Sequence, residues 1–205
     1  MTVATPPTRQ TPDLATGERR VAMSEAEFLA LPDTFPRVEY VDGESRFMSP
    51  VSLPHVRLSV WLVSYANRLV VKSSLGEVFS DTFTVRLSPG TARVPDLSFV
   101  ARASKSAIRE TYLEGPPDLI VEIVSAESRD RDYRDKYLDY QSAGVTEYII
   151  IDPAYQTIDL HRLEGGKYVP VVPENGALSS SVLPGFVLRA EWLKQSPLPD
   201  PSTLP

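Results

Sequence analysis

The sequence contains no cysteine and only two histidines, His55 and His161. Without cysteine there are no disulfide bonds, no thiol catalysis and no cysteine-based zinc sites, and two histidines exclude a multi-histidine metal centre. The longest apolar runs, such as 119–121 and 148–151, are far too short to span a bilayer. Because residues 1–20 also lack the apolar stretch of a signal peptide, we expect a cytoplasmic protein with no membrane partner.

The composition is that of one ordinary globular domain with tails. Of the 205 residues, 42% are apolar and 23% are charged, close to globular averages. Prolines gather at both ends, so we predict a disordered Pro/Thr-rich tail over 1–20, a single domain over 21–193 and a loose Pro-rich tail over 194–205. The net charge of −6 argues mildly against tight non-specific binding to DNA, which usually needs a strong basic footprint.

Hydrophobic periodicity predicts an α/β fold. The dipeptide Asp42-Gly43 is a favoured two-residue turn, which predicts an N-terminal hairpin. Apolar residues at three- and four-residue spacing predict a long helix over 55–74. A second helix over 130–143 lies between strands at 118–124 and 147–151, a pattern that predicts a β-α-β unit with parallel strands. We therefore expect a mixed β-sheet flanked by helices.

An acidic residue interrupts the most apolar of these strands. Residues 118–124 are apolar at almost every position, as in a central strand covered on both faces, and Glu122 lies within it. A buried carboxylate must take up a proton, pair with a cation or bind a metal.

A second acid poses the same problem. Asp96 follows Pro95 in a strand predicted over 94–100, and if the two strands are neighbours, Asp96 and Glu122 point into one cleft. Two carboxylates there repel each other unless a hard divalent cation lies between them. Such a cation, Mg²⁺ or Mn²⁺, polarises a phosphate and activates a water. The structural alternatives are that Asp96 is a turn or capping residue and that Glu122 pairs with an arginine.

The order Pro95-Asp96, then Glu122 in an apolar strand, resembles the PD-(D/E)XK nuclease superfamily. The wider chain is similar to the Uma-two family of restriction-endonuclease-like proteins over about residues 21–172. The similarity rests on RVEYVDGE (37–44), on MSP (48–50) followed by His55, on VPDLSFV (94–100) and on PPDLIVEIVSAESRDRDYRDKYLDYQSAGVTEYIIIDP (116–153).

This resemblance implies a restriction-endonuclease-like core with a mixed, roughly five-stranded sheet and a Mg²⁺-dependent phosphodiesterase site. Asp96 and Glu122 match the two metal ligands. The lysine position, two residues past Glu122, is occupied by Val124, and the resemblance offers Lys136 on the following helix as its substitute. Glu39 matches a further acidic position.

The position of Lys136 can be examined from the helical pattern. In the predicted helix, with Asp130 as its N-cap, Tyr133, Tyr137 and Tyr140 form one stripe that faces the sheet. At about 100° per residue, Lys136 lies beside that stripe, where a lysine can bring its ammonium group to a strand end. The alternative is a surface lysine paired with Asp132 or Asp139.

Basic residues that are candidates for contact with DNA lie on the long helix. Between His55 and Gly76 there are three cationic residues and no acid, and they are accompanied by a second group after position 92. The first group is Arg57, Arg68 and Lys72, and the second is Arg93, Arg102, Lys105 and Arg109. Both groups, with His55 beside the first, would suit phosphate contacts, but a solvated helix face gives the same pattern. For His55 and Glu39, the structural alternatives are a first-turn polar residue and a hairpin surface residue.

The leading hypothesis is a metal-dependent endonuclease that acts on DNA. In it Asp96 and Glu122 bind Mg²⁺ or Mn²⁺, with Glu39 nearby, and Lys136 orients or helps to deprotonate the attacking water. A second hypothesis is a non-catalytic nucleic-acid or protein binding module that keeps the fold, which Val124 and the negative net charge favour. A third is an obligate homodimer whose basic helix forms the partner surface.

Overall fold

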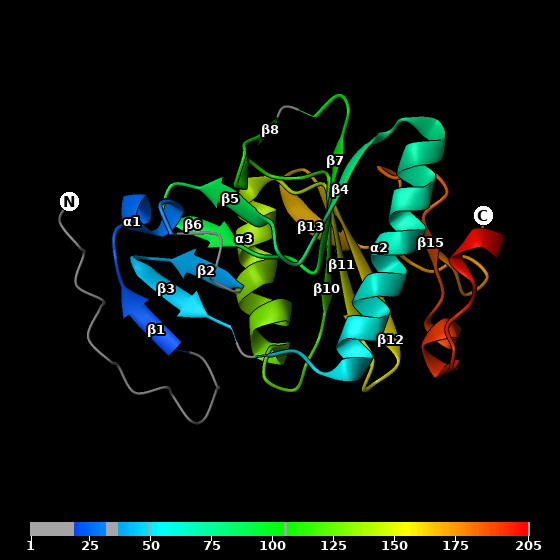
Figure 1. Cartoon of the computed structure of the whole chain (residues 1–205). Coiled ribbons are helices and arrows are strands. Elements are labelled where there is room, and N and C mark those ends of the chain that lie inside the picture. The colour runs from blue at the N-terminus through cyan, green and yellow to red at the C-terminus, as the bar shows by residue number, and fades with distance from the viewer. Residues whose placement is uncertain (1–18, 32–36, 49, 105, 205) are drawn as a thin grey trace.

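Two large β-sheets with a helix between them form most of the protein, and a two-stranded sheet accompanies them (Figure 1). The structure is a computed structural model, and it describes residues 19–31, 37–48, 50–104 and 106–204. The predicted tail over 1–18 and Lys105 lie outside the described residues. The last two residues of that tail, Arg19 and Arg20, belong to a strand, so the folded domain includes them.

The larger core is built on a six-stranded sheet. Its order is β13–β12–β11–β10–β7–β4, where β10 and β11 are parallel and the other pairs are antiparallel. The strands are β4 (Gly76–Ser80), β7 (Leu97–Ala101), β10 (Leu119–Ile123), β11 (Glu147–Asp152), β12 (Thr157–Glu164) and β13 (Lys167–Pro170). This is the predicted mixed sheet, with the predicted parallel pair, and it has six strands where the resemblance implied about five.

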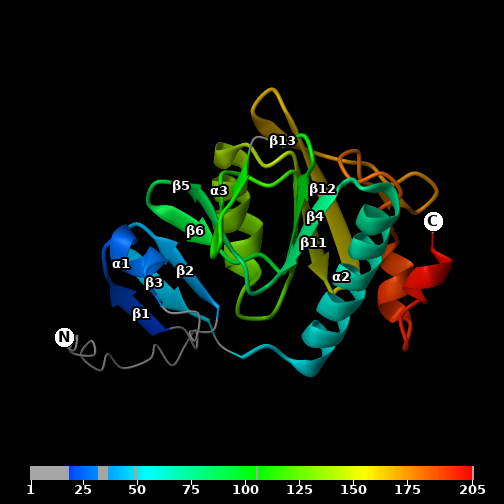
Figure 2. The same ribbon diagram turned by 45° about the horizontal axis from the view of Figure 1, so that its top comes forward.

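A second sheet of short strands lies beside the first (Figure 2). Its order is β1–β3–β2–β6–β5–β9–β8, and only the β5–β9 pair is parallel. The strands are β1 (Arg19–Ala22), β2 (Val38–Val41), β3 (Glu44–Phe47), β5 (Thr84–Ser88), β6 (Thr91–Arg93), β8 (Ala107–Ile108) and β9 (Tyr112–Glu114). The predicted hairpin joins β2 to β3, and its turn residues Asp42 and Gly43 both have positive φ, as this turn requires. Helix α1 (Glu25–Leu29) packs here through Phe28, which stacks on Tyr40.

Each face of the six-stranded sheet is covered by a different helix. Apolar side chains of α2 (Leu53–Ser73) pack against one face of β10, which presents Leu119, Val121 and Ile123. The opposite face presents Ile120, and it packs against α3 (Lys136–Ala143), which also contacts the second sheet. Because side chains alternate along a strand, Glu122 points to the α3 side. Its neighbours therefore come from α3 and from the second sheet.

The Pro-rich C-terminal segment is packed along α2, so the expectation of a loose tail is wrong for residues 194–204 (Figure 1). Trp61 Nε1 donates to the carbonyl of Pro199 at 2.6 Å, and Arg68 Nη2 donates to that of Leu204 at 2.9 Å. Prolines prevent an α-helix, but their carbonyls still accept these bonds. This segment contains the 3₁₀ turn η3 (Pro201–Thr203). The chain before it forms the paired strands β14 (Leu178–Ser179) and β15 (Val187–Leu188) and the 3₁₀ turn η2 (Ala190–Lys194).

No helix in the described part of the chain is long and apolar enough to cross a membrane.

Candidate active site

Asp96 and Glu122 lie on neighbouring chain segments, as the sequence analysis required. Asp96 comes immediately before β7, and β7 pairs with β10 with Leu97 opposite Val121. The backbone N–H of Ile123 donates to Asp96 Oδ2 at 2.7 Å, which ties the aspartate to the residue after Glu122. Both carboxylates line one cavity of about 460 Å³.

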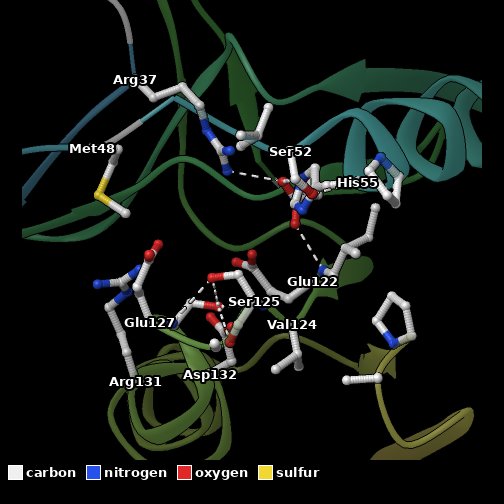
Figure 3. Close-up of a pocket in the computed structure, with 18 of the residues that line it drawn as sticks. Arg37, Met48, Ser52, His55, Glu122, Val124, Ser125, Glu127, Arg131 and Asp132 are labelled. Carbon is white, nitrogen blue, oxygen red and sulfur yellow. Dashed lines mark hydrogen bonds and ion pairs between the residues drawn. The ribbon is translucent and has the colours of Figure 1, made fainter. Parts of the chain in front are cut away.

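This cavity, which we call the acidic pocket, is shown in Figure 3. One side of its wall comes from the start of α2 and the chain before it, and the other side comes from the end of β10 and the loop and helix that follow. The lining residues include Arg37, Met48, Ser52, His55, Asp96, Glu122, Ser125, Ser128, Arg131, Asp132 and Lys136.

Asp96 is held by two basic side chains as well as by the backbone. Arg37 Nη2 lies 2.8 Å and His55 Nε2 lies 3.0 Å from Oδ1. Burial raises the pKa of Asp96, but the hydrogen bond from His55 and the charge of Arg37 outweigh burial and hold that pKa below its ordinary value. Asp96 is therefore a carboxylate at neutral pH. His55 reaches the acidic pocket because it begins the buried face of α2.

Glu122 has a different environment, because both its oxygens already have partners. Lys136 Nζ lies 2.8 Å from Oε2, and Tyr140 Oη donates to Oε1 at 2.6 Å. Burial raises the pKa of Glu122, Lys136 opposes this and Asp96 adds to it, and the net result is a pKa of about 8. The pKa values of Asp96 and Glu122 are thus shifted in opposite directions.

Lys136 lies in the interior, among three carboxylates. Its Nζ is 2.8 Å from Glu122, 3.1 Å from Asp132 and 3.6 Å from Glu39. Burial lowers the pKa of Lys136, but the three carboxylates outweigh burial, so the pKa lies above its ordinary value. Lys136 is therefore an ammonium ion at neutral pH, and it is not the surface lysine of the alternative interpretation.

Glu39, on β2, lies beside Lys136, but it is not among the described residues that line the acidic pocket. Arg93 Nη1 lies 2.7 Å from its Oε2, and Arg93 also binds Asp139 on α3. Burial raises the pKa of Glu39, but Lys136 and Arg93 outweigh this and lower it to about 2. The expectation that Arg93 faces phosphates is wrong, because its side chain is 1% exposed and neutralises two acids from separate elements.

The start of the second helix differs from the prediction. The helical segment is already wound at Asp130, whose side chain makes no capping hydrogen bond, and residues Arg131–Asp135 form a π-helical turn, η1, before α3. The wider turn changes which side chains face inward: Tyr133 is 37% exposed, and Asp132 is buried. The predicted stripe of tyrosines is therefore wrong at its first position.

Asp132 is the member of the acidic pocket that sequence reasoning missed. The sequence analysis names it only as a possible surface partner of Lys136, although the two residues are four positions apart, which is a spacing that brings side chains together on a helix. Its side chain is 1% exposed, and neither oxygen accepts a hydrogen bond from the described residues. Arg37 and Tyr140, which hold Asp96 and Glu122, were also missed.

The predicted DNA-contact residues of α2 are not gathered at the acidic pocket. Arg57 and Lys72 are exposed, and Arg57 follows His55 by two positions, about 200° around the helix. Arg68 donates to the carbonyl of Leu204. Of the basic residues proposed on α2, only His55 lines the pocket; contact of the others with DNA stays a prediction.

The acidic pocket offers oxygen donors suited to Mg²⁺ or Mn²⁺. Among the described residues no three His, Asp or Glu side chains are arranged to hold a metal ion. Mg²⁺, however, is usually bound by one or two carboxylates and completes its shell with water and phosphate oxygens. Asp96 and Glu122 are such a pair, and both line the acidic pocket. The residues present therefore fit the ion.

Comparison with known proteins gives a family match and a structural match. A model of the Uma2 family, described as "Putative restriction endonuclease", matches residues 25–191. The fold is similar to the crystal structure titled as a "putative nuclease belonging to DUF820" from Anabaena variabilis, with a TM-score of 0.68 and 22% identity, covering 83% of this chain and 97% of that chain. At that identity the likeness concerns the fold. No curated protein matches the chain.

Proposed function

The chain belongs to the Uma2 family, whose description is "Putative restriction endonuclease", and from this we propose that it is a metal-dependent endonuclease that hydrolyses phosphodiester bonds in DNA. The observation that carries the proposal is the convergence of Asp96, Glu122 and Lys136 in one acidic pocket. They come from three separate segments of the chain, and each is buried. Buried ionisable groups gathered in a cleft are typical of a functional site.

Asp96 and Glu122 would hold Mg²⁺ or Mn²⁺. When bound, the ion would polarise the phosphate and lower the pKa of a bound water. The side chains around the acids keep them in place: Arg37, His55 and the Ile123 amide hold Asp96, and Tyr140 holds Glu122. Such supporting contacts usually matter for metal affinity almost as much as the ligands do.

Lys136 would orient the attacking water and stabilise the negative charge that develops on the phosphate. Its raised pKa makes it a donor, so it does not take the proton from the water. In the reaction the water oxygen attacks phosphorus and the bond to the leaving sugar oxygen breaks. A proton from the water passes to solvent, and the leaving oxygen takes one up. Arg37 and Arg131 also line the acidic pocket, and they would add positive charge near the phosphate.

Incubation of the purified protein with supercoiled plasmid tests the proposal. With Mg²⁺ or Mn²⁺ the wild type should nick or linearise the plasmid. Asp96→Asn and Lys136→Met should each reduce the rate roughly a hundredfold or more. Glu110→Gln, at an exposed position outside the acidic pocket, is the matched control and should cleave as the wild type does.

Two outcomes would contradict catalysis. Cleavage that survives Asp96→Asn would belong to a contaminant. Absence of cleavage in a protein that binds Mn²⁺ through Asp96 would favour the non-catalytic binding module, which the valine at position 124, where the superfamily has lysine, already favours.

A further inference from the structure

Asp132 is a buried carboxylate that the proposed reaction does not use. It lines the acidic pocket on the π-helical turn, and its side chain is 1% exposed. Among the described residues, the only polar contact of its carboxylate is with Lys136, whose Nζ lies 3.1 Å from Oδ1, and Oδ2 has none. A buried carboxylate with so few partners is costly, so its retention calls for an explanation.

The contacts of Glu122 suggest what that explanation is. Both of its oxygens are engaged, one by Lys136 and the other by Tyr140. A metal ion that binds Glu122 must share or replace one of these partners. The ammonium is the partner that repels the ion, because the two carry charges of the same sign. Lys136 then needs another carboxylate in order to remain at the site.

Besides Glu122, two acids contact Lys136, and they differ in how many other partners they have. Glu39 is 3.6 Å from Nζ, and its other oxygen is bound by Arg93 at 2.7 Å. Asp132 is closer, and its carboxylate has no other partner among the described residues. It lies one turn before Lys136 on the same helical segment. Asp132 is therefore the acid better able to bind the ammonium group, because no second described cation binds its carboxylate.

We propose that Asp132 is a positioning residue that keeps the Lys136 ammonium in the acidic pocket when Glu122 turns to the metal ion. The inference rests on the proposed function, because it presumes an ion on Glu122. Asp132 acts through Lys136, and it is distinct from the ion's ligands, Asp96 and Glu122.

The test measures the chemical reactivity of Lys136, which does not depend on cleavage. The intact protein is labelled with an amine-acylating reagent, with and without Mn²⁺, and labelling at each lysine is read by mass spectrometry. Lys72, which is exposed, serves as the internal reference. In the wild type Lys136 should stay protected in both conditions. In Asp132→Asn it should stay protected without Mn²⁺ and become about tenfold more reactive with Mn²⁺, as loss of one charge-assisted hydrogen bond would give.

Asp135→Asn is the matched control, since it removes an acid three residues away that is half-buried and pairs with Arg134. It should label as the wild type does. Equal reactivity of Lys136 in Asp132→Asn with and without Mn²⁺ would overturn the inference, because a merely structural role gives that result.

A metal-free measurement covers the case in which Asp132→Asn folds poorly. Glu122→Gln removes the carboxyl group that Lys136 would lose to the ion. Lys136 should remain protected in Glu122→Gln and become reactive in the double variant Glu122→Gln, Asp132→Asn. Exposure of Lys136 in Glu122→Gln alone would contradict the inference.

Calorimetry with Mn²⁺ on the same samples separates the remaining outcomes. Equal Mn²⁺ affinity in the wild type and Asp132→Asn supports a positioning role. Loss of Mn²⁺ binding in Asp132→Asn would make Asp132 a metal ligand and overturn the inference while the proposed function stands. Absence of binding in the wild type would overturn both.

Discussion

The hydroxyl of Tyr140 on α3 donates a 2.6 Å hydrogen bond to Glu122 Oε1 on β10. This bond crosses from a helix to the buried centre of the sheet, and it fixes the orientation of the glutamate that would hold the ion. Both groups are fully buried. A tyrosine that packs in the core therefore also belongs to the support of the acidic pocket.

We predict that Tyr140→Phe weakens Mn²⁺ binding by roughly tenfold, as loss of a supporting contact does in metal sites. The unfolding free energy should fall by about 1–3 kcal/mol, because Glu122 Oε1 is left without its donor. Tyr168→Phe is the control: it removes another buried hydroxyl, which donates to the carbonyl of Val145. It should cost similar stability and leave Mn²⁺ affinity unchanged. Equal Mn²⁺ affinity in both variants would refute the role of Tyr140.

The raised pKa of Glu122 predicts how stability depends on pH without divalent cations. The folded protein keeps this proton up to about pH 8, whereas the unfolded chain loses it near the ordinary glutamate value of 4.5. Between these values the folded state binds more protons, so the unfolding free energy falls as pH rises. In Glu122→Gln that part of the slope should disappear. Urea denaturation at a series of pH values from 5 to 8 measures it, and identical slopes in both proteins would contradict the assignment.

Arg93 is predicted to be essential for stability and unimportant for direct contact with DNA. Arg93→Met leaves Glu39 and Asp139 without their shared partner, and breaking a buried pair in this way costs about 3–5 kcal/mol. Arg102→Met, at an exposed position, should change the unfolding free energy by less than about 0.5 kcal/mol. Chemical denaturation compares them. A similar, small effect of both substitutions would contradict the buried network.

The features that the sequence predicted correctly follow from simple local rules. Residues 118–124, which are apolar at almost every position, predicted a strand covered on both faces, and β10 is such a strand. The Asp42-Gly43 turn depends only on backbone conformation, and it forms as predicted. Asp96 could be placed near Glu122 because a β-sheet brings its neighbouring strands together.

The features that the sequence did not predict depend on contacts between distant elements. A constant 100° per residue placed Tyr133 inward, but the π-helical turn places Asp132 there instead. The sequence predicts Arg93 as a surface cation, because the acids that pair with it come from the distant elements β2 and α3. The packing of residues 194–204 depends on contacts with side chains of α2, such as Trp61. No local pattern reveals these partners.

A crystal soaked in Mn²⁺ tests the central claim most directly. Anomalous diffraction should show one strong peak in the acidic pocket, within coordination distance of carboxylate oxygens of Asp96 and Glu122, about 2.0–2.3 Å for such ions. Glu122→Gln crystals soaked in the same way should lack the peak. A pocket without Mn²⁺ in the wild type, with Lys136 still bound to Glu122, would contradict the account.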